Sequence, residues 1–206
     1  MRADIVLWDI GRVLLDWEPE RAYTSRISDA AARADFLENI CNMAWHCQHD
    51  AGISFADNAA PLIAEHPQYE EHIRAWGEHW FEMFDGYIDG TPALFDRLET
   101  TSAAQYALSN MPAEIWPEMQ VRFPLLGKFQ DAIISGEEGL IKPDARLYEI
   151  ALERMGNPAA DRVLFIDDSL PNIDAANRLG FKTHHFKTAS GLETALIGHK
   201  LLPAAS

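Results

Sequence analysis

The 206-residue sequence has few basic residues and no segment suited to a membrane. It carries 17 lysines and arginines against 32 aspartates and glutamates, and it has no basic stripe that could neutralise a nucleic-acid backbone. No apolar run approaches the ~20 residues of a transmembrane helix, and the opening MRADIVLWD does not resemble a secretion signal. We therefore expect a cytoplasmic protein that binds neither nucleic acid nor membranes.

Cysteine is nearly absent, with only Cys41 and Cys47 in the chain. The two lie six residues apart in a segment with a helical pattern, so they fall on different faces and form no metal-ligand pair. Apolar residues make up 48% of the sequence, with six tryptophans and ten phenylalanines among them. This content predicts a folded globular protein with one sizeable core, and we expect a monomer or a homodimer.

The charges and the histidines are unevenly distributed along the chain. Residues 16–89 contain 15 acidic residues, four arginines and no lysine, together with five of the eight histidines. The same segment has a helical pattern of apolar residues, with candidate helix starts at Ser28 or Asp29 and at Ser54. Residues 16–89 are therefore predicted to form a helical unit of their own.

After residue 90, short apolar runs alternate with amphipathic helices. The runs AQYALSN, DAIIS, RVLFIDD and KTHHF are typical of buried strands, and two of the helices end at Gly156 and Gly180. This alternation predicts right-handed βαβ units and a parallel sheet, to which the apolar residues 5–8 also belong. We expect an α/β core of residues 1–15 and 90–206, with the helical unit inserted as residues 16–89.

Polar residues follow four of the predicted strands, at the strand end or in the loop just beyond it. They are Asp9, Ser109 with Asn110, Lys142, and the pair Asp167 and Asp168. In an open parallel sheet the carboxyl ends of the strands share one edge, where ligands bind. Carboxylates without nearby cysteine or histidine suit Mg²⁺, and a lysine offsets the surplus negative charge. A carboxylate nucleophile, a cation site, a hydroxyl and a lysine together favour phosphoryl transfer.

Four segments resemble the motifs of the haloacid dehalogenase-like hydrolase superfamily, in the branch whose helical cap follows the first motif. They are WDIGRVLLDW, LSNMP, GLIKPDARLYEIAL and VLFIDDSLPNIDAANRLGF, and the resemblance covers essentially the whole chain. It implies a Rossmann-like parallel sheet core with an inserted helical cap domain. It also implies a Mg²⁺-dependent phosphatase that acts on a small phosphorylated metabolite through an aspartyl-phosphate.

The resemblance also implies which residues hold the metal. Asp9 would be both the nucleophile and a Mg²⁺ ligand, with the Gly11 carbonyl and Asp168 as further ligands. Asp167 and Asn172 would hold metal-bound water, although a cap on the helix that follows is an equal expectation for Asn172.

For the phosphoryl group, the resemblance implies three further contacts. Ser109 and the backbone N–H of Asn110 would bind phosphoryl oxygens, and Lys142 would bridge Asp9 and the phosphoryl group. Gly11 and Arg12 are also candidates for binding the substrate or its phosphoryl group. Arg12 is expected either to reach an anionic group of the substrate or to pair with nearby acidic residues of the 16–18 segment.

The chain departs from the superfamily at Gly11, where phosphatases usually carry a second aspartate that protonates the leaving group. The loss of a general acid commonly costs ~10²–10⁴-fold in rate. A branch similar to bacterial α-glucose-1-phosphate phosphatases shares the Asp-x-Gly motif and the adjacent aspartate pair. An anomeric leaving group needs less protonation, so we expect a sugar 1-phosphate or another activated phosphate as the substrate.

Residues of the helical cap are expected to set the choice of substrate. The candidates are His46, His49, Asp50, Trp76 and Trp80, because HDAGIS matches the cap loop that such enzymes turn toward the site. For each of them, packing or a place on the surface is the alternative.

Two other functions remain open. A 2-haloacid dehalogenase shares the nucleophile, the LSN and the KP segments, but it uses no metal and has an Asp-x-Tyr-Gly-Thr first motif. Gly11 and the pair Asp167 and Asp168 disfavour that function. The other alternative is a non-catalytic ligand-binding protein that lost turnover with its general acid, and the presence of Asp9 and Lys142 argues against it.

Overall fold

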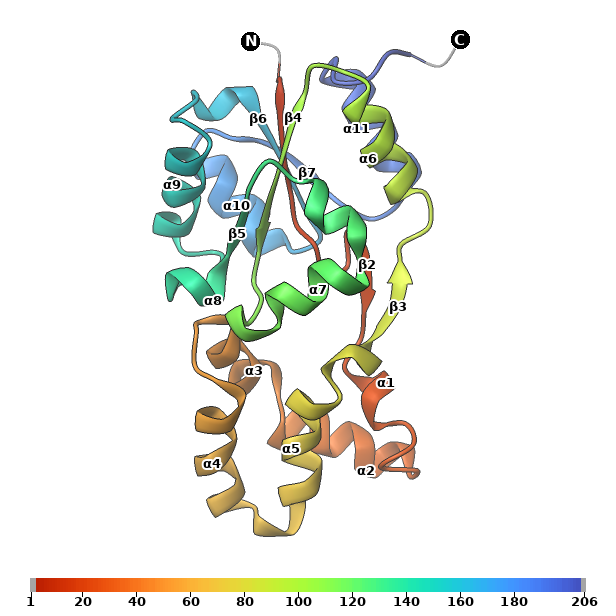
Figure 1. The fold of residues 1–206 in the computed structure, drawn as a ribbon, viewed down its shortest axis with the longest axis vertical. Helices are drawn as coiled ribbons and strands as arrows, with labels where there is room; N and C mark the ends of the chain where they lie inside the picture. The colour runs from red at the N-terminus through yellow and green to blue at the C-terminus, as the bar shows by residue number, and fades with distance from the viewer. Residues whose placement is uncertain (1–2, 205–206) are drawn as a thin grey trace.

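Strand β1 (Ile5–Trp8) lies at the centre of a five-stranded sheet in the computed structural model, which describes residues 3–204. Each pair of neighbouring strands in this sheet runs parallel. In sheet order the strands are β5 (Ala132–Ile134), β4 (Ala104–Ser109), β1, β6 (Val163–Asp167) and β7 (Lys182–His185) (Figure 1). The predicted parallel α/β core is confirmed, and the carboxyl ends of its strands share one edge.

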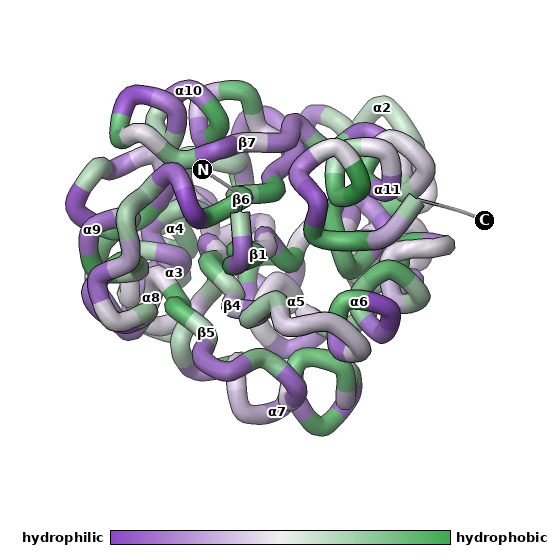
Figure 2. The backbone as a smooth tube through the Cα atoms, turned by 90° about the horizontal axis from the view of Figure 1, so that it is seen from above, coloured by the Kyte–Doolittle hydropathy of each residue, from purple (hydrophilic) through white to green (hydrophobic). Residues whose placement is uncertain are grey.

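The central strand is buried on both faces. Val6 and Trp8 belong to one apolar cluster, and Ile5 and Leu7 belong to a second cluster on the opposite face, as the alternation of side chains along a strand requires. Figure 2 shows helices on both sides of the strands. One side carries α6 (Thr91–Glu99) and α11 (Ala189–Gly198), and the other carries α9 (Ala145–Arg154) and α10 (Leu170–Arg178).

Shorter helices fill the loops of the core. They are α7 (Trp116–Arg122), α8 (Ser135–Glu138), and the 3₁₀ turns η4 (Ala113–Ile115), η5 (Pro124–Lys128) and η6 (Ala160–Arg162). Within residues 3–204, no helix combines the length and the apolar character needed to cross a membrane.

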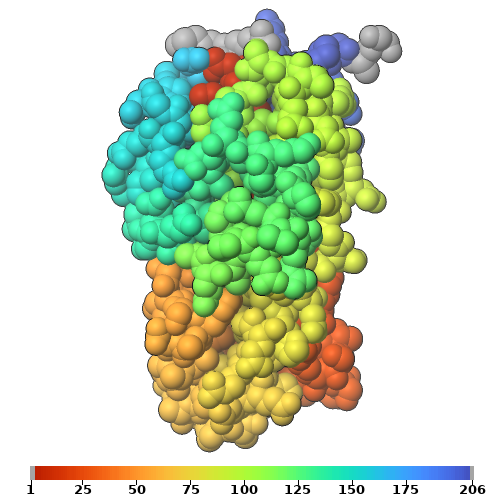
Figure 3. All heavy atoms as spheres, in the orientation of Figure 1, coloured from red at the N-terminus to blue at the C-terminus, as the bar shows by residue number. Residues whose placement is uncertain are grey.

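A two-stranded antiparallel ribbon joins the core to the helical insertion. Its strands are β2 (Leu15–Trp17), which leaves the core, and β3 (Phe84–Tyr87), which returns to it. The α-helices between them are α1 (Glu20–Tyr23), α2 (Ala30–Asp35), α3 (Met43–Asp50), α4 (Phe55–Glu65) and α5 (Glu70–Glu78), with the π-turn η1 (Phe36–Ile40) and the 3₁₀ turns η2 (Pro67–Tyr69) and η3 (Trp80–Met83). Figure 3 shows this cap packed directly against one end of the core. We propose residues 16–89 as its limits.

The helix starts predicted in the cap are largely confirmed. The side chain of Asp29 caps α2, and that of Ser54 caps α4. The segment from Ser28 to Cys47 is not one helix, however. It leaves the helical conformation at Cys41, and Asn42 then caps a new helix by accepting a hydrogen bond from the backbone of α3.

The loop after α3 contacts the core through a glycine. Gly52 has a φ of +96°, and a Cβ atom there would lie 2.8 Å from the carbonyl oxygen of Gly136. We expect Gly52→Ala to lower the free energy of unfolding by about 1–3 kcal/mol, because alanine is strained in this conformation and would press the cap away from the core. Urea unfolding measures the change.

Gly198→Ala is the matched control for this substitution. Gly198 lies in α11 and does not have a positive φ, and no atom outside its own stretch of helix lies within 4 Å of its Cβ position. Alanine there should leave stability unchanged or raise it, because it is the better helix former. Equal effects of the two substitutions would contradict the proposed contact between the Gly52 loop and the core.

Candidate active site

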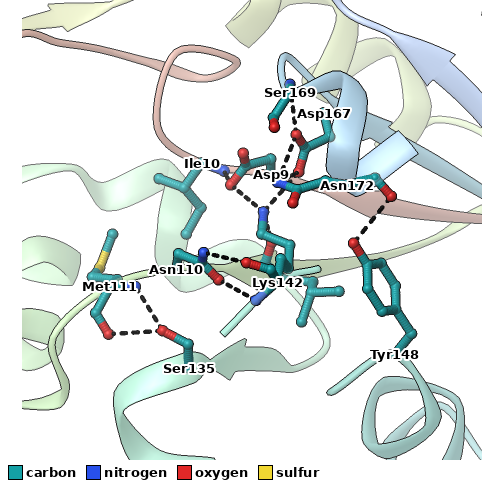
Figure 4. A network of polar contacts seen from close by, with 11 residues as sticks. Asp9, Ile10, Asn110, Met111, Ser135, Lys142, Tyr148, Asp167, Ser169 and Asn172 are labelled. Carbon is teal, nitrogen blue, oxygen red and sulfur yellow. Dashed lines mark hydrogen bonds and ion pairs between the residues drawn. The ribbon is translucent and has the colours of Figure 1, made fainter. Parts of the chain in front are cut away.

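Asp9 directly follows β1 at the carboxyl edge of the sheet. Its backbone N–H donates to the carbonyl of Ile166 at 2.9 Å, which extends the pairing of β1 with β6 by one residue. Its Oδ1 accepts a hydrogen bond from the backbone N–H of Ile10 at 2.7 Å and lies 2.9 Å from Nζ of Lys142 (Figure 4). Only 7% of Asp9 is exposed. The sheet thus holds one carboxylate in a fixed orientation at the end of its central strand.

Lys142 joins two carboxylates from different strands. Its Nζ lies 2.9 Å from Asp9 Oδ1, 2.8 Å from Asp167 Oδ2 and 2.9 Å from the carbonyl oxygen of Leu108. These three contacts match the three donors of an ammonium group. The side chain of Asn110 fixes the backbone of the same lysine, since it accepts from Lys142 N–H at 2.7 Å and donates to its carbonyl at 3.1 Å. The lysine is therefore held rigidly beside Asp9.

Asp167 is fully buried and is engaged on both of its oxygens. Oδ1 accepts from the backbone of Ser169 at 2.8 Å, Oδ2 accepts from Lys142, and the amide of Asn172 donates to both at 3.1 Å. Asn172 lies inside α10, and Ser169 occupies the N-cap position, so the expectation that Asn172 caps this helix is wrong. Because Asp167 has so many protein partners, Asp9 and Asp168 are the better candidates for direct binding of a cation.

The site carries more negative charge than positive charge. Carboxylate oxygens of Asp9, Asp167 and Asp168 lie within 4.8 Å of one another, with one ammonium among them. Burial raises the pKa of Asp9 well above its ordinary value, although the nearby ammonium of Lys142 acts to lower it. Burial and the negative charge of Asp167 raise the pKa of Asp168. Burial alone would lower the pKa of Lys142, but Asp167 and Asp9 outweigh it and raise that pKa, so the ammonium stays charged. Clustered hard oxygen donors with uncompensated charge fit Mg²⁺.

Gly11 and Arg12 lie at the start of the turn that leads to β2. Apart from Gly11 and its two chain neighbours, no residue has an atom within 4 Å of the position that a Cβ of Gly11 would occupy. Arg12 has a φ of +56°, its guanidinium pairs with Glu18 at 3.4 Å, and it stacks over the Trp17 ring at 5.3 Å. The predicted pairing of Arg12 with a nearby acidic residue is thus observed. Arg12 also borders the cavity around Asp9, so contact with a substrate stays a prediction.

A cavity of about 380 Å³ lies between the core and the cap, and it brings the predicted residues together. From the core it is bordered by Asp9, Gly11, Arg12, Ser109, Asn110, Lys142, Asp168 and Asn172. From the cap and the ribbon it is bordered by Trp17, Met43, His46, Cys47 and Asp50. Ser109, at the end of β4, is buried and borders the cavity together with Asp9.

The cap candidates divide into two groups. His46 and Asp50 border the cavity around Asp9, and Trp80 borders a smaller adjoining cavity with Gly11. His49 and Trp76 border neither of these two cavities, and both are buried in the cap. Burial, together with His46, lowers the pKa of His49 to about 4, as expected for a packed neutral histidine.

Trp17 is a cavity residue that the sequence did not indicate. It borders both the cavity around Asp9 and the smaller one beside Gly11, and its ring lies against His46 at a centroid distance of 5.2 Å. Its place at the end of the segment WDIGRVLLDW, where the predicted helical unit begins, was the available signal.

The sequence and the fold both match known proteins. Residues 4–180 match the family described as haloacid dehalogenase-like hydrolase. The sesquiterpene phosphatase astK of Aspergillus oryzae is 30% identical over 191 residues, which cover 87% of this chain and 87% of that protein. The match to the family and this relative both span most of the chain.

Two solved structures have the same fold. A HAD-like family hydrolase from Porphyromonas gingivalis matches with a TM-score of 0.72 at 17% identity, over 96% of this chain and 98% of that one. A magnesium complex of a HAD family enzyme from Bacteroides thetaiotaomicron matches with a TM-score of 0.71 at 20% identity, over 91% and 95%. The sheet topology, the sequence match and these neighbours agree, and the chain belongs to the haloacid dehalogenase-like hydrolase family.

Proposed function

We propose that the protein is a Mg²⁺-dependent phosphatase that hydrolyses a small organic monophosphate through an aspartyl-phosphate on Asp9. The observation that carries this proposal is the buried bridge from Asp9 through Lys142 to Asp167, which lies at a cavity with Asp168 beside it. A carboxylate held by an ammonium, next to further acidic oxygens for a cation, is suited to attack on phosphorus. The 30% identical phosphatase of Aspergillus oryzae supports the same chemistry.

The residues around the cavity have separate tasks in this reaction. Asp9 attacks the phosphorus atom, and the charged Lys142 offsets the negative charge that gathers during the attack. The hydroxyl of Ser109 and the backbone N–H of Asn110 donate hydrogen bonds to phosphoryl oxygens. Arg12 at the rim attracts the anionic substrate.

The proposed metal site consists of Asp9, Asp168 and the backbone carbonyl of Gly11. Bound Mg²⁺ would supply positive charge that neutralises the phosphoryl oxygens. We expect a chelator to abolish phosphate release and added Mg²⁺ to restore it, as followed by a colorimetric phosphate assay. Full activity in the chelated protein would contradict the metal site.

Two classes of monophosphate are candidate substrates. A sugar 1-phosphate fits the absence of an acid at Gly11, because its anomeric oxygen leaves with little protonation. The cavity beside Gly11 is bordered by Trp17, Trp80 and Phe84, and such rings accept either the apolar face of a sugar or a hydrocarbon chain. The sesquiterpene phosphatase similar to this chain adds prenyl monophosphates as the second class.

A panel of monophosphates tests the function directly. We expect the protein with Mg²⁺ to release phosphate from acetyl phosphate, and from sugar 1-phosphates or prenyl monophosphates, faster than from simple alkyl monophosphates. Cleavage of simple alkyl monophosphates with none of these other three kinds of compound would contradict the substrate class. No release from any compound would contradict the phosphatase.

The alternatives differ from the phosphatase in what they release or bind. A 2-haloacid dehalogenase would release chloride from 2-chloropropionate without metal, and the acidic pair Asp167 and Asp168 disfavours it. A non-catalytic protein would lack a competent nucleophile and metal site. Beryllium or aluminium fluoride should therefore bind tightly, in the presence of Mg²⁺, only if the protein is a phosphatase.

Gly11→Asp is expected to raise the rate on alkyl monophosphates relative to the rate on acetyl phosphate, because it adds a carboxyl group that can protonate the leaving oxygen. The open space around the Cβ position, and a φ outside the left-handed region, allow the substitution. The rate on acetyl phosphate should change little, since its leaving group needs no proton. Phosphate release from both substrates measures the ratio of the alkyl rate to the acetyl phosphate rate.

Gly11→Ala is the matched control, because it fills the same space without an acid. Its alkyl-to-acyl rate ratio should stay at the wild-type value. If alanine raised that ratio as much as aspartate, the role assigned to the missing carboxyl group would be wrong.

A further inference from the structure

The cap contributes one buried acid–base pair to the cavity around Asp9. His46 and Asp50 lie one helical turn apart on α3, and Nε2 of His46 is 3.2 Å from Oδ2 of Asp50. Only 4% of His46 and 3% of Asp50 are exposed. Both residues border the same cavity as Asp9, so the cap brings an imidazole and a carboxylate to the cavity of the proposed nucleophile.

The imidazole is held in one orientation. Its ring stacks against Trp17 at a centroid distance of 5.2 Å and against Trp80 at 5.5 Å, while Asp50 holds Nε2. The other nitrogen, Nδ1, is buried and has no hydrogen-bond partner within residues 3–204. Buried polar atoms are normally paired, so Nδ1 is an unfilled hydrogen-bonding position on a residue that borders the cavity.

His46 borders the same cavity as Gly11, the position where the chain lacks an acid. His46 and Gly11 border the same small cavity of about 50 Å³, together with Trp17 and Trp80 from the ribbon and the cap and Ser109 from the core. An organic group that leaves from a phosphate near Ser109 therefore has no carboxyl group on its Gly11 side but has an imidazole on its cap side. Histidine is the side chain most often used for proton transfer near neutral pH.

We propose that His46, oriented by Asp50, gives a proton to the leaving oxygen of the substrate, the task that an aspartate at position 11 would perform. This inference rests on the phosphatase function proposed above. As the bond from Asp9 Oδ to phosphorus forms, the bond from phosphorus to the bridging oxygen breaks. The bridging oxygen keeps the electron pair and takes the proton from Nδ1, so the alcohol leaves neutral.

The second half of the reaction returns the proton. Neutral His46 accepts a proton from a water molecule as its oxygen attacks the phosphorus of the aspartyl-phosphate. The bond between Asp9 and phosphorus breaks, its electron pair returns to the carboxylate, and inorganic phosphate leaves. His46 and Asp9 are then in their starting states, and Asp50 acts as a positioning residue that keeps Nε2 engaged throughout.

The dependence of the rate on the leaving group tests this role. The leaving group of p-nitrophenyl phosphate needs no proton, whereas a simple alkyl monophosphate needs one. We expect His46→Gln to lower kcat on the alkyl compound by ~10²–10⁴-fold and kcat on p-nitrophenyl phosphate by less than about tenfold. Gly11→Asp in the His46→Gln background should restore the rate on the alkyl compound.

His49→Gln is the matched control for His46→Gln. His49 lies on the same helix, is equally buried, and has both ring nitrogens engaged, with Ile53 O at 3.4 Å and Asn58 at 3.2 Å. It should leave the alkyl-to-aryl rate ratio at the wild-type value. If His46→Gln fails to fold, Asp50→Asn is the second variant, and it should lower the same ratio.

Each outcome tests either the role of His46 or the proposed phosphatase function on which that role depends. An equal loss on both substrates, or no loss, would assign His46 a structural role and overturn the inference. A wild type that cleaves p-nitrophenyl phosphate but no alkyl monophosphate would also overturn the inference, but the phosphatase function would survive. A wild type that cleaves neither compound overturns the phosphatase function, and the role of His46 falls with it.

Discussion

An Asp9→Asn variant is expected to lose phosphate release by a factor on the order of 10⁴ or more, because an amide cannot form the aspartyl-phosphate. The variant should fold as well as the wild type. Burial already raises the pKa of Asp9 well above its ordinary value, so a neutral side chain of the same shape is tolerated there. Phosphate assays with acetyl phosphate and Mg²⁺, together with thermal unfolding, measure both properties.

Asp4→Asn is the matched control at the other end of the same strand. Asp4 precedes β1 and forms a surface ion pair with Arg162, far from the cavity residues. Its loss should leave the activity unchanged. An Asp9→Asn variant with activity close to that of Asp4→Asn would show that another residue accepts the phosphoryl group.

A Lys142→Met variant is expected to lose both activity and stability. The substitution removes the ammonium that lies between Asp9 and Asp167 and leaves two carboxylates close together in a buried site. Removal of one partner of a buried ion pair commonly costs about 3–5 kcal/mol in the free energy of unfolding. Urea unfolding measures the loss. Added Mg²⁺ should recover part of the stability, because it replaces some of the missing positive charge.

Lys128→Met is the matched control for the loss of a doubly paired lysine. Lys128 also contacts two carboxylates, Asp96 and Glu99, each at 2.8 Å, but the three side chains lie on the surface. Water and salt screen such pairs, so the stability should change little. If the two substitutions cost the same, burial would not be the reason that Lys142 matters.

The core and its edge could be predicted because their signals are local. Four strands were visible as apolar runs that end in polar residues, and the parallel topology then forces Asp9, Ser109, Lys142 and Asp168 toward one edge. The structure brings these four residues together at one cavity, as predicted. Their catalytic roles stay predictions.

The ribbon of β2 and β3 could not be predicted in the same way. Its strands have three and four residues, and their pairing joins Leu15 to Tyr87 across the whole cap. Such short strands form because the partner is present, not because of a local pattern. The ribbon carries Trp17 to the cavity, which explains why that residue was missed.

The sequence also could not show which side chains contact one another. Lys142 was expected to connect Asp9 with the phosphoryl group, and the structure shows that it also holds Asp167. The i, i+4 spacing of His46 and Asp50 was visible in the sequence. Which face of α3 meets the core, however, depends on how the cap packs, and that packing sets His46 apart from His49.

The most direct test of the proposed chemistry is to find the phosphoryl group on the protein. Wild-type protein is mixed with Mg²⁺ and acetyl phosphate that carries a radioactive label, quenched in acid within the first turnovers, and cut into peptides. We predict that the label lies on the peptide that contains Asp9, and that the Asp9→Asn protein carries none. Label on a different residue, or turnover of acetyl phosphate without any labelled peptide, would contradict an aspartyl-phosphate at Asp9.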